Sequence, residues 1–325
     1  MKDNMTENCH KMLNSLILKS RHFCKYAAPD ALGDILMVYL SSGKVPDELL
    51  FSKKLSYDYD YFAFTKSTKS LMAIKCLLND DKYFFNEDCF MLIRSIFECH
   101  IMSRYIREHI DIENERENVI KKFIVNPLSV TFNHYTLQGY NIFDTSGNKV
   151  GSIPMPNNFI AGNDKLYYSD FYQFLCQYTH CSFGALTCYY GEKQFTYSKN
   201  NFSLLTLLFS LFVFTKIYEG VVTVKGEDLG DTKEEKIFYD LAYDSLELQN
   251  RLFDYLIDYY EKKPQEEVNR ILEKYLGDGS YDGTDKKIAN MLANMKASLL
   301  DSEIGSLNKS VFEYGQFKRF YPSWN

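Results

Sequence analysis

Hydrophobic residues recur at intervals of three and four along most of the chain, the spacing that places apolar side chains on one face of an α-helix. Leu13, Leu16 and Ile17 show this pattern near the start, before Pro29 interrupts it. The same periodicity predicts helices over residues 6–26, 31–40, 67–78, 86–109, 169–178, 202–219, 232–263 and 286–300, with a further short helix ending at residue 276.

Polar residues at several of these predicted starts suit helix caps. Ser67 or Thr68 can cap the third helix, after a polar connector rich in tyrosine. Asn86 suits the N-cap of the fourth helix. Thr232 and Glu235 match a capping box, in which each side chain bonds a free backbone N–H of the first turn.

The pattern changes to alternation between residues 126 and 158, where apolar and polar residues follow one another. Val130, Phe132, Ile142 and Val150 belong to this stretch, and Asp144 begins a turn sequence that continues to residue 148. Alternation around a turn is typical of two paired strands. We therefore expect a small β-hairpin near residues 130–155, inserted between helices.

Together these patterns predict a mainly α fold, a helical bundle with a small inserted β-hairpin. The expected organisation is an N-terminal helical segment at 1–66, a core helical domain at 67–220 and a C-terminal segment of long helices and tail at 221–325. The 325 residues and a hydrophobic content of 46% are enough to build a substantial core.

Net charge and cysteine spacing indicate which binding partners and which cellular compartment to expect. Lys and Arg number 37 against 43 Asp and Glu, and a net charge of -6 argues against general binding to nucleic acid or anionic membranes. The eight cysteines lack the spacing of small secreted domains, and residues 1–11 lack a signal-peptide pattern. The apolar run 202–214 is shorter than a bilayer requires. We expect a cytoplasmic protein with reduced thiols and no membrane partner.

The most informative segment for chemistry lies inside the predicted helix 86–109. Arg94 and Glu98 are one turn apart and share a face, among largely apolar neighbours. This spacing is typical of an intrahelical ion pair that also bonds a neighbouring helix. Charges in an apolar setting are also a feature of functional sites, so Arg94 and Glu98 are candidate site residues as well.

Two motifs resemble a family of uncharacterised bacterial helical proteins defined as a domain of unknown function. The first is Arg94-Ser95 followed by Phe97-Glu98, and the second is the segment 178–182, Tyr-Thr-His-Cys-Ser, which contains His180. The resemblance covers residues 68–218 and excludes both ends. It implies a helical bundle and, by itself, no activity.

A more distant likeness is to HEPN-type helical bundles, many of which are metal-independent ribonucleases with an Arg followed four to six residues later by His. Arg94 with His100, and Arg104 with His109, have this spacing. The polar residue that such proteins place after the Arg is matched only partly by Ser95. The resemblance implies that a His takes the ribose 2′-hydroxyl proton while an Arg stabilises the phosphate. His180 is an alternative base.

Other sites are incomplete in the sequence. Cys176 and His180, four residues apart, have the spacing of half a zinc site, but no CxxC pair occurs that would supply the second half. The loop after residue 277 matches the first half of a calcium loop, but Ala289 stands where a bidentate Glu is needed. No phosphate loop, dinucleotide fingerprint or nucleophile elbow occurs. We expect no metal and no cofactor.

Two hypotheses follow from the sequence. In the first, the chain is a bacterial helical-bundle protein that acts through protein or ligand interaction. In the second, it is a HEPN-like endoribonuclease of a toxin or phage-defence system. The expected partner is an unknown protein or RNA, with a homodimer as one arrangement. The hypotheses differ in whether Arg94, Glu98, His100 and His180 meet at one cleft.

Overall fold

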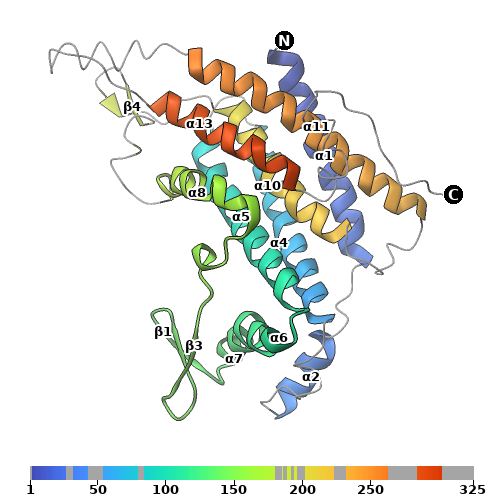
Figure 1. The fold of residues 1–325 in the computed structure, drawn as a ribbon, viewed down its shortest axis with the longest axis vertical. Helices are drawn as coiled ribbons and strands as arrows, with labels where there is room; N and C mark the ends of the chain where they lie inside the picture. Colours follow the sequence, from blue (N-terminus) through green and yellow to red (C-terminus); the bar gives the residue numbers. More distant parts are fainter. Residues whose placement is uncertain are drawn as a thin grey trace.

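The computed structural model describes residues 2–26, 32–42, 54–79, 84–179, 202–222, 232–262 and 284–301, together with 185, 189–191 and 194–195. These residues are mostly helical, which confirms the predicted mainly α fold (Figure 1). The α-helices are α1 (Lys2–Tyr26), α2 (Leu32–Ser42), α4 (Lys54–Leu78), α5 (Asn86–His109), α6 (Glu113–Ile120), α7 (Asn126–Thr131), α8 (Tyr168–Cys176), α10 (Ser203–Val222), α11 (Thr232–Lys262) and α13 (Thr284–Ala297).

Shorter helical turns connect several of these elements. A π-helical turn, η1 (Lys121–Val125), joins α6 to α7. Three 3-10 turns are η2 (Pro156–Asn158), η3 (Gly162–Leu166) and η5 (Ser298–Asp301). η3 directly precedes α8 and contacts α13 and η5, so it links the middle of the chain to its C-terminal helices.

Helix α10 forms the centre of the bundle. It packs against α1, α4, α5 and α11. Among the described helices it alone is long and apolar enough to cross a membrane, and nearly all of its residues are buried inside the bundle. α10 is therefore the core helix around which the others are arranged. The apolar cluster that surrounds it runs from Cys9 in α1 to Leu299 in η5 and has members in all three predicted segments.

The predicted connector before Ser67 is wrong, because α4 begins at Lys54 and includes the tyrosine-rich stretch. Asp60, Ala63, Phe64 and Ser67 are all buried and follow helical spacing. Two of these four are polar, so the buried stripe does not stand out as a run of apolar residues. The predicted cap is also wrong, since residue 68 lies inside the helix and its hydroxyl donates to the carbonyl of Phe64 at 2.8 Å.

The start of α5 also differs from the prediction. Phe85 occupies the N-cap and makes no side-chain capping bond, while Asn86 is the first helical residue. The amide of Asn86 is buried, and its Oδ1 accepts a hydrogen bond from Thr206 of α10 at 3.2 Å. The side chain of Asn86 therefore bonds a neighbouring helix and does not provide the cap for α5 that the local sequence predicts.

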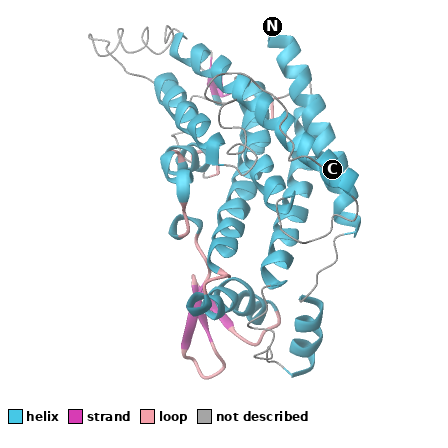
Figure 2. Ribbon diagram, turned by 45° about the vertical axis from the view of Figure 1, so that its right-hand side comes forward, coloured by secondary structure: helices cyan, strands magenta, loops and turns pink. Residues whose placement is uncertain are grey.

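The predicted hairpin is present within a three-stranded antiparallel sheet. Its strands are β1 (Thr136–Gln138), β2 (Asn141–Phe143) and β3 (Lys149–Ser152), in the order β1-β2-β3. Between β2 and β3, the carboxylate of Asp144 accepts from the backbone N–H of Ser146 and Asn148 at 2.9 and 2.8 Å. The sheet lies at one end of the bundle (Figure 2), near α7 (Figure 1). Val130 belongs to α7 rather than to a strand.

Several predictions concern the remaining helices. α8, α10 and α11 lie where the periodicity placed helices, and α13 begins at Thr284 and is followed by η5. The side chains of the predicted capping box at Thr232 and Glu235, the short helix ending at 276 and the loop after 277 lie outside the described residues. The short strands β4 (Tyr190–Gly191) and β5 (Gln194–Phe195) form a separate antiparallel pair.

Candidate functional site

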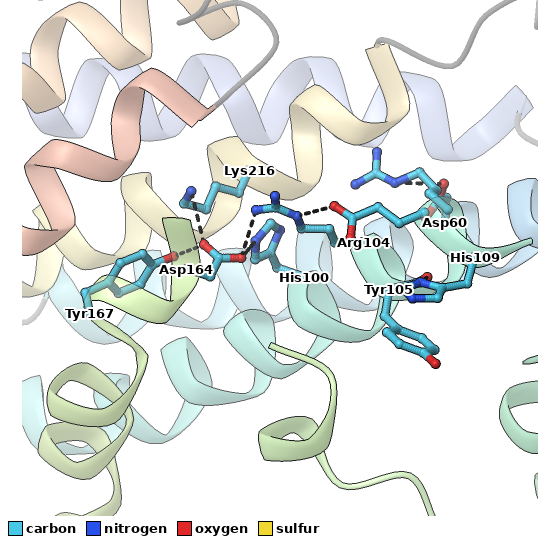
Figure 3. A network of polar contacts seen from close by, with 10 residues as sticks. Asp60, His100, Arg104, Tyr105, His109, Asp164, Tyr167 and Lys216 are labelled. Carbon is cyan, nitrogen blue, oxygen red and sulfur yellow. Dashed lines mark hydrogen bonds and ion pairs between the residues drawn. The ribbon is translucent and has the colours of Figure 1, made fainter. Parts of the chain in front are cut away.

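Helix α5 carries two separate polar clusters on different faces. The first, the inner cluster, is centred on the carboxylate of Asp164, which is fully buried. Its partners are His100 and Arg104 of α5, Tyr167 between η3 and α8, and Lys216 of α10 (Figure 3). Four donors from three segments of the chain therefore converge on one carboxylate.

The distances show how the two oxygens of Asp164 are shared. Oδ2 lies 2.9 Å from Nε2 of His100 and 3.2 Å from Nη1 of Arg104. Oδ1 accepts from the hydroxyl of Tyr167 and lies 3.5 Å from Nζ of Lys216. Arg104 also donates to Glu108 at 2.8 Å, which extends the cluster toward the surface. Each oxygen of the buried carboxylate therefore has two neighbouring donors, and a buried charge needs such partners.

This geometry explains the ionisation of the cluster. Burial alone raises the pKa of Asp164, but Lys216 and then His100 outweigh it and hold the pKa well below its usual value. Burial lowers the pKa of His100, and Asp164 opposes that effect only in part. His100 is therefore neutral at pH 7, and its Nε2–H donates to the ionised Asp164. Burial, and then Asp164, raise the pKa of Tyr167.

The inner cluster has the properties of a structural centre. His100 is only 4% exposed and Lys216 only 8%. The remaining nitrogen of His100, Nδ1, is buried and has no hydrogen-bond partner among the described residues. The bond between His100 and Asp164 joins α5 to η3.

A second buried carboxylate, that of Asp60 in α4, contacts the second half of α5. Its Oδ1 accepts from the hydroxyl of Ser103, and its Oδ2 is 3.6 Å from Nε of Arg107. Burial raises the pKa of Asp60 to about 6, with Arg107 and Ser103 opposing the rise. The guanidinium of Arg107 passes over Gly220 of α10, where a Cβ would lie 2.3 Å from Nη1. The absence of a side chain at Gly220 therefore leaves the space that the guanidinium of Arg107 occupies.

The outer cluster consists of Arg94 and Glu98 of α5 with Tyr168 and Tyr172 of α8. Nε of Arg94 donates to Oε1 of Glu98 at 2.9 Å, and Nη2 donates to the hydroxyl of Tyr172 at 2.7 Å. That hydroxyl in turn donates to Oε1 of Glu98 at 3.0 Å. The side chains of Arg94 and Glu98 are 23% and 30% exposed, so solvent reaches this cluster.

The two tyrosines complete the outer cluster. Their rings stack with centroids 5.1 Å apart, and the guanidinium of Arg94 lies over the ring of Tyr172 at 4.8 Å. Burial and then Glu98 raise the pKa of Tyr172 to about 12. The hydroxyl of Tyr168 is buried and has no hydrogen-bond partner within the described part of the chain, and burial and then Tyr172 raise its pKa. Such a hydroxyl is costly unless something bonds it.

The predicted site residues divide between these clusters. Arg94 and Glu98 meet in the outer cluster, as their spacing predicts, whereas His100 belongs to the inner cluster on another face of α5. His180 lies outside the described residues. The second Arg-His spacing does not bring its members together either, because Arg104 points to Asp164 while His109 stacks on Tyr105 at 3.9 Å (Figure 3).

Sequence reasoning missed several members of both clusters. Lys216 was detectable as a charge within the apolar helix 202–219. Asp164 lies in a polar turn whose composition is typical of a solvated loop. Tyr168 and Tyr172 are separated by one helical turn, but the chain contains 26 tyrosines, so their spacing alone carries little information.

We also searched for metal-binding groups and compared the chain with known proteins. Within the part of the chain that the structure describes, no group of three or more His, Cys, Asp or Glu side chains is placed to hold a metal ion. The six described cysteines are free thiols. Comparison of the chain with family models, curated proteins and solved structures finds no match in any of the three.

Proposed function

We propose that this protein acts by binding a ligand or partner at the outer cluster, without cleaving RNA. The observation that carries the proposal is the separation of Arg94 from His100. Arg94 lies on a solvent-accessible face and bonds Glu98, while His100 is buried on another face and bonds Asp164. The binding groups of Arg94 are thus exposed, whereas the histidine of the Arg94–His100 spacing is enclosed.

The electrostatics of the outer cluster support this proposal over a nuclease. A ribonuclease of the expected type needs an arginine whose charge acts on the phosphate and a histidine within reach of the ribose hydroxyl. The charge of Arg94 is already matched by Glu98 at 2.9 Å. A phosphate brought to Arg94 would also meet the carboxylate of Glu98, and like charges at this range repel.

An RNA cleavage assay tests the catalytic part of the proposal. Purified full-length protein is incubated with end-labelled RNA and compared with the variants Arg94→Ala and His100→Gln. A matched control is Arg251→Ala, which removes an Arg-Glu pair of the same helical spacing, with Glu247, from the surface of α11. We expect no cleavage in any sample beyond the buffer control.

The opposite result has a clear form. RNA cleavage by the parent protein that is lost in Arg94→Ala or His100→Gln, but retained in Arg251→Ala at equal melting temperature, would establish the endoribonuclease hypothesis. A catalytic proton-transfer group can be removed without emptying the core, so equal stability is the required check.

A further inference from the structure

The two clusters on α5 differ in how much of their hydrogen-bonding capacity the chain uses. In the inner cluster both oxygens of Asp164 have partners. In the outer cluster, among the described residues, Oε1 of Glu98 accepts two bonds while Oε2 accepts none. Arg94 has five N–H donors, and its bonds to described residues use one on Nε and one on Nη2. The outer cluster therefore has N–H donors and a carboxylate oxygen to which a ligand can bond.

Tyr168 provides a second, independent observation. The residue is only 7% exposed, yet its hydroxyl has no hydrogen-bond partner among the described residues. Its ring stacks on the ring of Tyr172, with centroids 5.1 Å apart, and the hydroxyl of Tyr172 bonds both Arg94 and Glu98. Buried hydroxyls in folded proteins are nearly always bonded, so this one has unused bonding capacity beside the outer cluster.

We propose that the outer cluster binds a neutral amide group, whose carbonyl oxygen accepts from the free donors of Arg94 and whose N–H donates to Oε2 of Glu98. The hydroxyl of Tyr168 provides a third hydrogen bond. This assignment rests on the proposed binding function and names its ligand class. An amide presents an acceptor beside a donor in one plane, as the adjacent guanidinium and carboxylate require.

Charge selects the amide over ionised ligands. Arg94 and Glu98 together carry no net charge, and they are held 2.9 Å apart. A carboxylate or phosphate that bonds Arg94 is repelled by Glu98, and an ammonium or amidinium that bonds Glu98 is repelled by Arg94. A neutral donor-acceptor pair satisfies both side chains without either repulsion.

An isosteric series tests this selection. Benzamide, benzoate and benzamidine share one ring and differ in charge, and their dissociation constants are measured by ligand-observed NMR titration of the full-length protein at neutral pH. Fragments of this size bind in the millimolar range. We expect benzamide to bind at least about tenfold more tightly than the other two, a difference of about 1.4 kcal/mol.

Variants assign the binding to the outer cluster. Tyr168→Phe removes only the unpartnered hydroxyl, and Arg94→Ala removes the donor, so each should weaken benzamide binding by about tenfold or more. Arg251→Ala should leave it unchanged. Tighter binding of benzoate or benzamidine, binding of benzamide that none of these variants alters, or the absence of saturable binding by all three compounds would overturn the amide assignment. The RNA cleavage assay decides the proposed function separately, so the two failures are distinguishable.

Discussion

The strongest stability prediction concerns the pair formed by Asp164 and Lys216 at the centre of the bundle. Asp164→Asn preserves the shape of the side chain but removes its charge, and Lys216 then has no carboxylate at its 3.5 Å position. An uncompensated buried charge typically costs about 3 to 5 kcal/mol. Arg104 keeps Glu108 as a partner, so Lys216 dominates the loss. We expect a decrease in the free energy of unfolding of about 3 to 5 kcal/mol.

The double variant Asp164→Asn/Lys216→Met isolates the pair. Methionine fills the volume of the lysine stem without a charge to desolvate, so the double change should cost less than the sum of the single changes. The expected interaction energy is on the order of 0.5 to 3 kcal/mol. Urea unfolding followed by circular dichroism at neutral pH measures all four free energies. A control cycle at Asp254 and Lys296, an Asp-Lys pair between α11 and α13, should give about 0 to 1 kcal/mol because Asp254 is largely exposed.

The pH dependence provides an additional check. A carboxyl whose pKa is lowered in the folded state contributes stability above its unfolded pKa, and this contribution is lost as the pH falls through the folded value. The pKa of Asp164 is lowered, so its advantage over Asn should stay constant from neutral pH to about pH 4 and decrease only below it. Additive single and double changes, within about 0.5 kcal/mol, would refute the coupling.

Three further outcomes follow from individual contacts. Tyr168→Phe should raise the free energy of unfolding, by about 1 kcal/mol, because it removes a buried hydroxyl without a partner; a loss in urea unfolding would contradict this. Gly220→Ala should lower the melting temperature, because its Cβ displaces the Arg107 guanidinium that pairs with Asp60; an unchanged value would exclude the contact. Burial lowers the folded-state pKa of His100, so the free energy of unfolding of the parent should decrease as the pH falls below about 6.5. Relative to His100→Gln, the decrease should reach up to about 1.4 kcal/mol per pH unit. Parallel pH profiles of the two proteins would exclude this.

The helices were predictable from sequence wherever an apolar stripe faces the core. α8 is one example, since Phe171, Phe174 and Leu175 recur at helical spacing and are all buried. The turn beginning at Asp144 was predictable for a related reason, because the side chain of Asp144 bonds backbone groups only two and four residues away. Both features depend on residues only a few positions apart, so the local sequence is enough to predict them.

The first half of α4 shows where this reasoning stops. Its buried face contains Asp60, which looks like a surface residue in the sequence and is stabilised by Ser103, 43 positions away. Asn86 is similar, because its bond to Thr206 spans 120 positions and replaces the cap that local sequence favours. Tertiary contacts decided both cases, since the free energy of satisfying a buried polar group exceeds most local preferences.

For the candidate site, sequence by itself determined that Arg94 and Glu98 lie one turn apart and form a pair, because helical geometry specifies which residues share a face. It could not determine that His100 faces Asp164, 64 positions away, or that Tyr172 of α8 lies against Arg94 with Tyr168 stacked on it. Only the packing of α5 against η3, α8 and α10 separates an enclosed ionic centre from an open, solvent-accessible face. The physical reason is that desolvation depends on all the chain segments surrounding a group, and therefore on the whole fold.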